Sequence, residues 1–296
     1  LNNEAPPQTL VREVTDSLDR AVTDERIKAV VLDLDGLQGG GLAKLQTIGD
    51  KIQKVRDAGK KVIAIGSGYT RDQYYLASRA DEVIMHELGL VYLEGYDYYR
   101  MFFRSALEKL QVDLNVFRVG EFKSFVEPFI RDDMSAEDRE ASQVWLSGLW
   151  SAWERDVAAA RKLKPGALQS YADDLASRIE AEKGNAARAA VNAGLVDRLM
   201  SRPDVDDYLL GLVGESKADE GTYSAIDFRA YALATGIERR LQDGKEHNVA
   251  IIVASGQIVD GEAAPGIIGG DTLAAEIRSA RLDDAVIIET RAEEIG

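Results

Sequence analysis

One lysine of the chain stands among aromatic side chains, directly after a glycine turn. Lys123 lies between Phe122 and Phe125 and follows Gly120. Most lysines are solvated cations, and composition alone predicts a surface position for this one. An apolar surround, however, disfavours the charged ammonium and lowers its pKa, and a lysine that is partly neutral near pH 7 can act as a general base. The segment therefore allows either an ordinary surface lysine or a catalytic base.

A base lysine needs a nucleophile within its reach. Ser124 is adjacent to Lys123, and adjacent side chains diverge on a helix or strand, so it is a poor partner. The chain has no cysteine, which excludes thiol nucleophiles, disulfides and cysteine-ligated zinc. Two histidines, His86 and His247, are too few for a multi-histidine metal site and argue against a Ser-His-Asp triad. If Lys123 is a base, it therefore needs a nucleophile other than Ser124.

A second candidate site follows an apolar run early in the chain. Asp33-Leu34-Asp35-Gly36 resembles the Asp-x-Asp start of haloacid-dehalogenase-type phosphatases, in which the first aspartate attacks the phosphate and the second acts as acid and base beside a magnesium ion. Ser67 and the pair Asp132-Asp133 could complete such a site. The alternative is that both aspartates are turn and capping residues at a strand end. We favour this alternative, because short motifs often match by chance.

Two weaker signals have simple structural explanations. Gly39-Gly40-Gly41 precedes a predicted helix and could cradle an anion, but no Gly-Lys-Ser/Thr follows, so a flexible turn is the better interpretation. His86 stands beside Glu87 with no second ligand at metal spacing, which favours a surface or hydrogen-bonded histidine. We therefore expect no metal ion and no cofactor.

The composition excludes several kinds of partner. The 296 residues carry 36 basic and 51 acidic side chains, a net charge of −15, which argues against a nucleic-acid partner and a general anionic membrane surface. Hydrophobic residues make up 45% and charged residues 29%, proportions typical of a globular protein. No run of about 18 apolar residues predicts a membrane span, and no secretory signal opens the chain.

Helices and strands alternate over the first 120 residues. Short apolar runs predict strands buried on both faces, and stretches with apolar residues three or four apart predict helices between them. This alternation is typical of parallel βαβ units and of the α/β class. The predicted strands are 29–34, 61–65, 82–85 and 114–119, and the predicted helices are 8–26, 42–58, 72–79 and 98–110.

The pattern becomes helical after residue 130. Ser135-Ala136-Glu137-Asp138 fits a helix N-cap box, and a helix is predicted from there to about residue 163. An apolar stripe on this helix consists of Trp145, Leu149, Trp153 and Val157. Such a stripe usually packs against other helices, although exposed aromatic residues also mark subunit or substrate contacts. Two further helical stretches end near Met200.

The last third of the chain begins like a second α/β domain. A strand is predicted at 249–253 and a helix at 273–280, followed by an acidic turn and an apolar strand, an order that also occurs at 17–32. This weak internal repeat indicates two copies of one fold. We predict a first domain at 1–200 with a long helical region from about 135, a linker with one short helix at 201–245, and the truncated start of a second copy at 246–296.

One segment resembles a known family closely. Residues 120–129, Gly-Glu-Phe-Lys-Ser-Phe-Val-Glu-Pro-Phe, are similar to the Gly-x-(Tyr/Phe)-Lys-Ser-Ala-x-Glu-Pro-Phe segment of the signal peptide peptidase A family, also called protease IV, in its long two-copy form. Supporting matches are residues 73–78, 192–197 and 256–262. The resemblance extends over essentially the whole chain.

The resemblance implies a fold and a mechanism. Each copy in the family resembles the crotonase/Clp-protease fold, a βα superhelical domain, here with a helical extension. The long form is a serine endopeptidase with a Ser/Lys dyad, and Lys123 falls on its general-base lysine. The nucleophilic serine belongs to the second copy, in an Ala-Ser-Gly-Gly-Tyr-type motif that this sequence lacks. Arg71 stands at the corresponding place in the first copy, so we expect this copy to donate only the lysine.

The resemblance also implies partners and a location. Members of the family degrade cleaved signal peptides, so the expected substrates are signal peptides or other hydrophobic peptides. The full-length form is anchored in the bacterial inner membrane, faces the periplasm and forms a ring-like homo-oligomer, which we expect to be a tetramer. Because the sequence lacks the anchor and the serine motif, we expect a soluble, inactive fragment of such a protein. The phosphatase and a non-catalytic crotonase-fold scaffold remain as alternatives.

Overall fold

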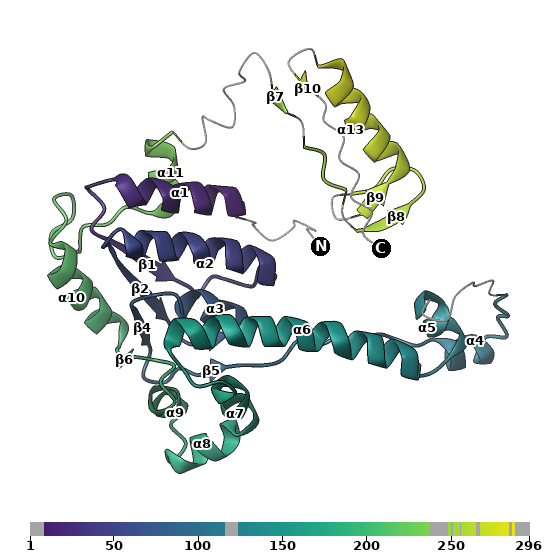
Figure 1. Ribbon diagram of the computed structural model, residues 1–296, viewed down its shortest axis with the longest axis horizontal. Helices are drawn as coiled ribbons and strands as arrows, with labels where there is room; N and C mark the ends of the chain where they lie inside the picture. The colour runs from purple at the N-terminus through teal and green to yellow at the C-terminus, as the bar shows by residue number, and fades with distance from the viewer. Residues whose placement is uncertain are drawn as a thin grey trace. The chain divides into compact units, whose positions relative to one another are not determined.

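The computed structural model describes residues 9–115, 124–236, 248–249, 251–254, 256–264, 267–283 and 286–287. The chain divides into two units, Leu1–Phe228 and Arg229–Gly296, and each is described by itself, with the labels of Figure 1. Within the described ranges, no helix combines the length and the apolar character needed to cross a membrane.

A four-stranded parallel sheet lies at the centre of the first unit. Its strand order is β1-β2-β4-β6, and Val31 pairs with Ile63 while Ile65 pairs with Ile84. The strands are β1 (Ala29–Asp33), β2 (Lys61–Gly66), β4 (Glu82–Met85) and β6 (Arg198–Leu199). This sheet confirms the α/β class with parallel strands that the sequence predicts.

Alternate side chains of β2 face two layers of helices. Val62 and Ala64 belong to the main core with α1, α2 and α3, whereas Ile63 and Ile65 contribute to a second core with α10. These helices are α1 (Val11–Thr23), α2 (Leu42–Asp57), α3 (Arg71–Ala77) and α10 (Arg202–Val213). Successive strand side chains point to opposite faces. Helices on both faces therefore explain why β2 is an unbroken apolar run.

α10 occupies residues that the sequence predicts to be linker. Its buried residues Val205 and Leu209 lie four apart and pack on the sheet. Ser201 caps the helix, because its Oγ accepts a hydrogen bond from Asp204 N at 3.4 Å. Residues 202–213 are thus a packed helix of the first unit, since two apolar residues at helical spacing suffice to bury one face of an otherwise acidic segment.

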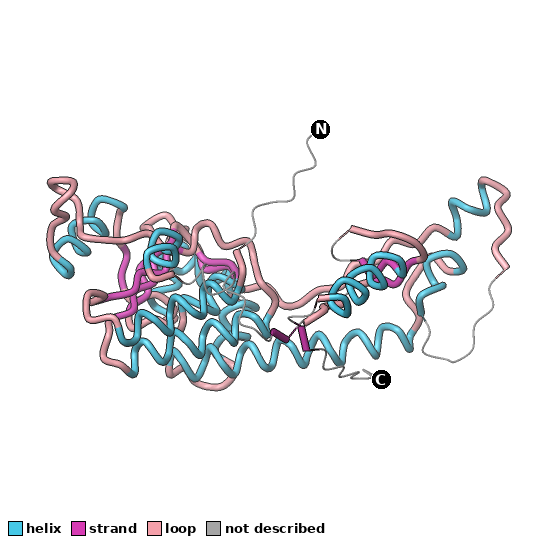
Figure 2. Tube along the Cα trace, turned by 90° about the horizontal axis from the view of Figure 1, so that it is seen from above, coloured by secondary structure: helices cyan, strands magenta, loops and turns pink. Residues whose placement is uncertain are grey.

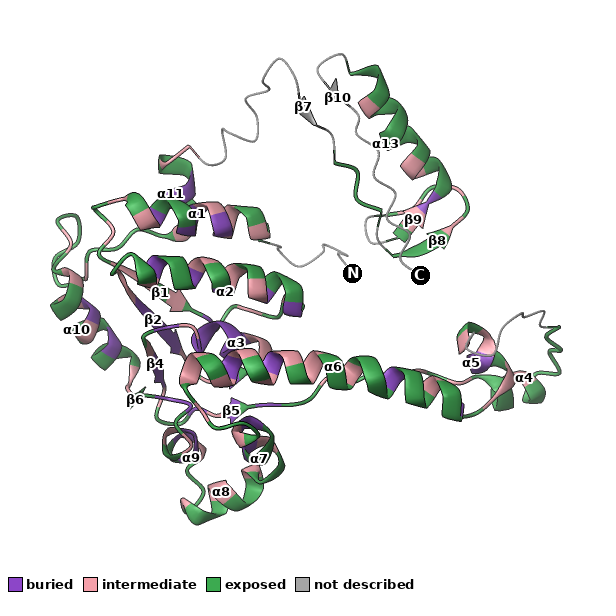
Figure 3. Ribbon diagram, viewed as in Figure 1, coloured by how far each residue is buried: buried purple, intermediate pink, exposed green. Residues whose placement is uncertain are grey.

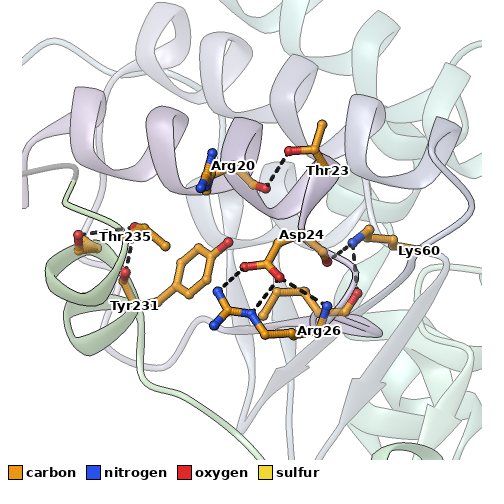
Figure 4. Close-up of polar contacts among 9 residues, drawn as sticks. Arg20, Thr23, Asp24, Arg26, Lys60, Tyr231 and Thr235 are labelled. Atoms are coloured by element: carbon orange, nitrogen blue, oxygen red, sulfur yellow. Dashed lines mark hydrogen bonds and ion pairs between the residues drawn. The ribbon is translucent and has the colours of Figure 1, made fainter.

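Polar contacts fix the turn that joins α1 to β1 (Figure 4). Asp24 accepts hydrogen bonds from Arg26 through Nε at 2.9 Å and Nη2 at 2.7 Å. Lys60, just before β2, donates from Nζ to the carbonyl oxygens of Asp24 at 2.5 Å and Ile27 at 2.9 Å. The lysine thereby ties the turn to the start of the neighbouring strand.

α6 (Ala136–Arg161) is one continuous helix with two different halves (Figures 1 and 2). In its second half, Trp153 and Val157 are fully buried in the main core, and Trp153 stacks on Trp150 with ring centroids 5.0 Å apart. The first half extends beyond this core and exposes Val144 and Trp145 (Figure 3). The predicted apolar stripe therefore packs in one half of the helix and meets solvent in the other.

Short elements lie at the far end of α6 from the sheet (Figure 1). They are α4 (Arg104–Lys109), the 3₁₀ turn η1 (Ser124–Val126) and α5 (Glu127–Ile130). The sequence predicts a longer helix at 98–110, but residues 98–103 are not helical. Tyr99 and Met101 are exposed, so these apolar side chains do not pack on a core.

Three short helices connect α6 to β6 and complete the main core. Leu168, Tyr171 and Ala190 are buried there, and Tyr171 donates its hydroxyl hydrogen to Val91 O at 3.1 Å. The helices are α7 (Ala167–Asp173), α8 (Leu175–Ala181) and α9 (Ala186–Asn192). Val91 belongs to β5 (Val91–Tyr92), which pairs in parallel with β3 (Tyr69–Thr70).

The second unit contains two small strand pairs among its described residues. β8 (Gln257–Val259) pairs with β9 (Ile267–Gly269), and β7 (Asn248–Val249) pairs with β10 (Val286–Ile287). α13 (Gly270–Leu282) follows β9, and α11 (Phe228–Ala234) begins at the unit boundary. The strand predicted at 249–253 is shorter than expected, because residues 251–253 form no strand.

Candidate active site

The predicted base, Lys123, lies outside the described residues, as do Phe122 and Glu121. The described chain resumes at Ser124 with η1 and continues into α5. Of the predicted strand 114–119, Leu114 and Asn115 are described and form no strand, and the other positions lie outside the described residues. The site must therefore be described from the residues that follow Lys123 and from those that contact them.

The aromatic residues after Lys123 are open to solvent in this chain. The Phe125 side chain is 72% exposed. Phe129 is also exposed, although its ring stacks on that of Phe103 with centroids 6.1 Å apart. Among the described residues, these two rings therefore have apolar surface that no other part of the first unit covers.

Glu127 is buried in this segment and points to the start of α6. The residue is only 4% exposed, and its Oε2 accepts a hydrogen bond from Ser135 N at 3.1 Å. Ser135 is the N-cap of α6, and its Oγ accepts a hydrogen bond from Asp138 N at 3.1 Å. The predicted N-cap is thus confirmed, and the carboxylate of Glu127 binds a second N–H group at the positive end of the same helix.

Residues 98–105 donate hydrogen bonds to the segment 124–132, which follows Lys123. Arg100 donates from Nη2 to Ser124 O at 2.7 Å, and Phe103 N donates to Pro128 O at 2.6 Å. Ser105 donates from its hydroxyl and its N–H to Asp132 Oδ1, at 2.7 and 3.0 Å. These hydrogen bonds lower the pKa of Asp132 below its usual value. Sequence reasoning missed Arg100, because no motif signals a contact that depends on the tertiary fold.

Arg71 stands where the resemblance would put a nucleophile; three groups hold its side chain, and a fourth contact is made to its backbone carbonyl. Nη1 donates to Gly95 O at 2.9 Å, and the guanidinium lies 3.9 Å from the centre of the Tyr96 ring. Nε pairs with Asp72 Oδ1 at 3.0 Å, and Trp153 Nε1 donates to Arg71 O at 3.3 Å. Burial raises the pKa of Tyr96, so a neutral phenol ring faces the cation. A group held in this way stabilises the fold and cannot attack a carbonyl.

The glycine loop at 39–41 contacts a carboxylate of the protein itself. Gly40 N lies 3.4 Å from Asp72 Oδ2, and a Cβ added at Gly39 would lie 3.0 Å from the same oxygen. Gly39 and Gly41 have φ values of 140° and 70°, which favour glycine. The loop is therefore a turn that accommodates Asp72, in agreement with the simpler interpretation of the sequence.

The aspartates of the phosphatase alternative are bound to separate partners. Asp35 accepts hydrogen bonds from Ser67 N at 2.6 Å and Ser67 Oγ at 2.9 Å, and Asp33 pairs with Arg202 at 2.9 Å. Asp132, beside α4 and α5, lies at the far end of α6 (Figure 1). Across the described ranges, no three acidic or histidine side chains converge as metal ligands would. The two aspartates act as strand-end residues, as the simpler interpretation predicts.

His86 also has a local role. Its side-chain Nδ1 accepts a hydrogen bond from Leu88 N at 3.1 Å, and its backbone N–H donates to Gly66 O at 3.1 Å. The histidine therefore closes the turn after β4, as expected from a residue without nearby ligands.

A groove runs along one face of α6. It has a volume of about 720 Å³ and combines aromatic and small polar side chains, among them Tyr96, Tyr98, Ser147 and Trp150. Tyr98 meets Trp145 edge to face, with ring centroids 6.1 Å apart. The groove has the size of a small-ligand site and a lining that suits an apolar chain with hydrogen-bonding backbone groups.

Comparison with known proteins gives a consistent set of relatives. The sequence model of peptidase family S49 matches residues 54–210. Protease 4 of Salmonella typhi is 38% identical over 274 residues, which are 93% of this chain and 43% of that protein. Protease 4 of Haemophilus influenzae is 37% identical over 288 residues, 97% of this chain and 46% of that protein. The chloroplastic serine protease SPPA of Arabidopsis thaliana is 26% identical over 273 residues, 91% of this chain and 39% of that protein.

The chain thus spans less than half the length of these relatives. Among solved structures, a probable enoyl-CoA hydratase from Mycobacterium smegmatis matches 71% of this chain and 88% of its own chain. It does so at 15% identity and a TM-score of 0.25, too slight a likeness to support an argument.

Proposed function

This chain belongs to peptidase family S49, and from that membership we propose that it supplies the general-base lysine, Lys123, of a serine peptidase. The nucleophilic serine comes from a part of the protein beyond this chain. The observation that carries the proposal is the family match over residues 54–210, which includes the Lys-Ser-x-x-Glu-Pro-Phe segment at 123–129. The engagement of Arg71 by Gly95, Asp72 and Tyr96 supports a half without its own nucleophile.

In this mechanism the lysine must be neutral to act. Neutral Lys123 takes the proton of the serine hydroxyl while the serine oxygen attacks the peptide carbonyl, and the resulting ammonium donates a proton to the leaving amine. Backbone N–H groups in the serine-bearing part hold the oxyanion. A lysine with the ordinary pKa of about 10.4 is less than about 0.1% neutral at pH 7, so the site must lower this pKa.

The proposed mechanism assigns a part in the catalytic site to the exposed rings that follow Lys123 in the sequence. Phe125 and Phe129 lie on the surface of this chain next to the lysine segment. In the proposed mechanism, the serine-bearing part or the bound substrate covers these rings and excludes water from the lysine. Because desolvation disfavours the ammonium form, the base becomes competent only in the assembled site.

The proposal extends to substrate and location. We propose hydrophobic peptides, including cleaved signal peptides, as substrates, and the groove beside Tyr96 and Trp150 offers a surface of suitable character. The protein acts at the periplasmic face of the bacterial inner membrane through an anchor outside this chain, as a homo-oligomer, which we take to be a tetramer. The relatives named Protease 4 from two bacteria support the peptidase part of this proposal.

The proposed base is tested by changing Lys123 in a full-length protein that contains this chain. Lys123→Arg keeps a positive charge but forbids deprotonation, since the guanidinium does not titrate in this range. We expect kcat for a fluorogenic hydrophobic peptide to fall at least about 1,000-fold while the circular dichroism spectrum is unchanged. Lys109→Arg, at an exposed position of α4, is the matched control and should retain full activity. Near-normal turnover by Lys123→Arg would show that the base lies elsewhere.

A further inference from the structure

The chain on either side of α5 has almost no apolar core. Of the described residues between 98 and 135, only Glu127, Pro128 and Ser135 are buried. Apolar burial is the main force that orders protein segments, and a segment without it depends on polar contacts for a defined position. The polar contacts here are therefore decisive for where the residues after Lys123 lie.

Arg100 makes two of these contacts and joins two segments. Nη2 donates to Ser124 O at 2.7 Å, and Nη1 pairs with Asp138 Oδ2 at 3.1 Å. The side chains of Arg100 and Asp138 are only 14% and 11% exposed, although their surroundings are largely open. The planar guanidinium thus connects the residue after Lys123 to the first turn of α6, in a geometry that lysine could not reproduce.

Glu127, in the segment that follows Lys123, also contacts the N-terminus of α6. Its buried carboxylate accepts a hydrogen bond from Ser135 N, at the N-cap of α6. Arg100 and Glu127 therefore fix the two ends of a four-residue stretch, from Ser124 to Glu127, on the same helix end. This stretch directly follows Lys123 in the sequence.

We propose that Arg100 and Glu127 are positioning residues of the peptidase site, which fix the backbone next to the base lysine on the N-terminus of α6. The inference rests on the proposed function of Lys123. Neither side chain touches the reacting groups in this scheme. Their role is to limit the positions from which Lys123 can reach the serine, because a misplacement of about 1 Å at a reacting group costs about 100-fold in rate.

The test compares four substitutions in the full-length protein. We expect Arg100→Met and Glu127→Ala to lower kcat for a fluorogenic hydrophobic peptide at least about tenfold, with KM changed less than about twofold. Glu127→Gln should restore most of the rate, since the amide oxygen can still accept the hydrogen bond from Ser135 N. Arg104→Met is the matched control, because Arg104 is half exposed and forms an ion pair with the exposed Glu108 on the same helix, α4. Circular dichroism measures the folded fraction of each variant, so that the rates can be compared per folded molecule.

A second readout does not require activity. In this chain, hydrogen exchange of the amides at 126–131 should be at least about tenfold faster in Arg100→Met than in the unchanged chain, and unchanged in Arg104→Met. If Arg100→Met does not fold, Arg100→Lys takes its place in both measurements, with a smaller effect in the same direction.

The outcomes separate the two proposals. Activity that survives Lys123→Ala would overturn the proposed base, whatever the other variants do. Activity that is lost in Lys123→Ala but kept in Arg100→Met and Glu127→Ala would overturn the positioning role alone. The positioning role would also be overturned by two results together: kcat of Glu127→Gln as low as that of Glu127→Ala, and unchanged hydrogen exchange at 126–131 in Arg100→Met.

Discussion

Asp197 shows how a single carboxylate anchors the long helix to the sheet. It accepts hydrogen bonds from Val83 N at 2.7 Å and from Arg161 at 2.8 Å and 2.7 Å, the last two in a bidentate pair at the end of α6. Burial alone would raise the pKa of Asp197, but these hydrogen bonds outweigh it and hold the pKa below its usual value. The charged form is therefore the one that stabilises the fold.

The depressed pKa of Asp197 gives a pH-dependent prediction. Because the folded-state pKa lies below the unfolded value of about 3.9, the contribution is complete above about pH 4 and is lost as the pH falls through the folded-state pKa. We expect Asp197→Asn to lower the free energy of unfolding by about 1 kcal/mol at pH 7, a modest figure because solvent screens a partly exposed pair. Urea unfolding should show this difference shrinking from pH 4 downwards.

The exposed Asp207 of α10 provides the control for this experiment. Asp207→Asn should leave the free energy of unfolding within about 0.5 kcal/mol of the unchanged chain. A deficit in Asp197→Asn that stays constant between pH 7 and pH 2.5 would show that the side chain acts through packing and not through charge.

At the scale of elements, the apolar stripe of α6 is buried in the core at one end of the helix and exposed at the other. Trp153 is fully buried against the main core, whereas Trp145, two turns earlier, is exposed and contacts Tyr98. We expect Trp153→Ala to lower the free energy of unfolding by about 3–5 kcal/mol, the usual cost of removing a buried aromatic side chain. Trp145→Ala should cost less than about 1.5 kcal/mol. Thermal unfolding by circular dichroism measures both, and equal losses would contradict the division.

The elements that the sequence predicts well are those whose pattern and core agree. β1, β2 and β4 lie within one residue of the predicted strands. β2 and β4 are apolar runs buried in the sheet, which leaves little choice of structure, whereas β1 is an edge strand with Val31 exposed. The helix predicted at 98–110 shrinks to α4, since its apolar residues face no core. The sequence predicts one short helix within 201–245 but does not place it, because acidic residues surround Val205 and Leu209; Ser201 followed by Pro203 is a usable signal for the start of α10.

The motif of the candidate site can be predicted from the sequence, but the residues that contact the motif cannot. The Lys-Ser-x-x-Glu-Pro-Phe pattern predicts Lys123 as the base, and this stays a prediction because Lys123 lies outside the described residues. The partners of this segment, Arg100 and Ser135, depend on how three segments meet at one helix end. Local sequence patterns carry no information about such tertiary contacts, so these contacts become known only from the structure.

At the scale of the whole molecule, the two units differ in how their strands are supported. In the first unit, β2 lies between two strands and two layers of helices. In the described part of the second unit, β8 pairs with β9 alone, and Ile251, Val253 and Ile258 are exposed. Two-stranded sheets are marginal by themselves, so the second unit should open more easily.

Hydrogen exchange measures this difference directly. Amides of Val62 to Ile65 should be protected at least about 100-fold more than those of Ile258 and Ile268, because exchange in the first unit requires opening of a buried core. Comparable protection in both units would show that the second unit has support equal to that of the first.

The late arrival of β6 has a consequence for synthesis of the chain. β4 ends at Met85, but its partner, in which Arg198 pairs with Ile84, is translated only after residues 86–197. At about 5–20 residues per second, a ribosome needs roughly 6–20 s to cross that interval. Throughout it, a nascent β1-β2-β4 sheet presents the outer edge of β4 without its partner, and open edges invite pairing with other chains. The length of the segment between β4 and β6, which includes the candidate site, therefore also sets how long this edge stays unpaired during synthesis.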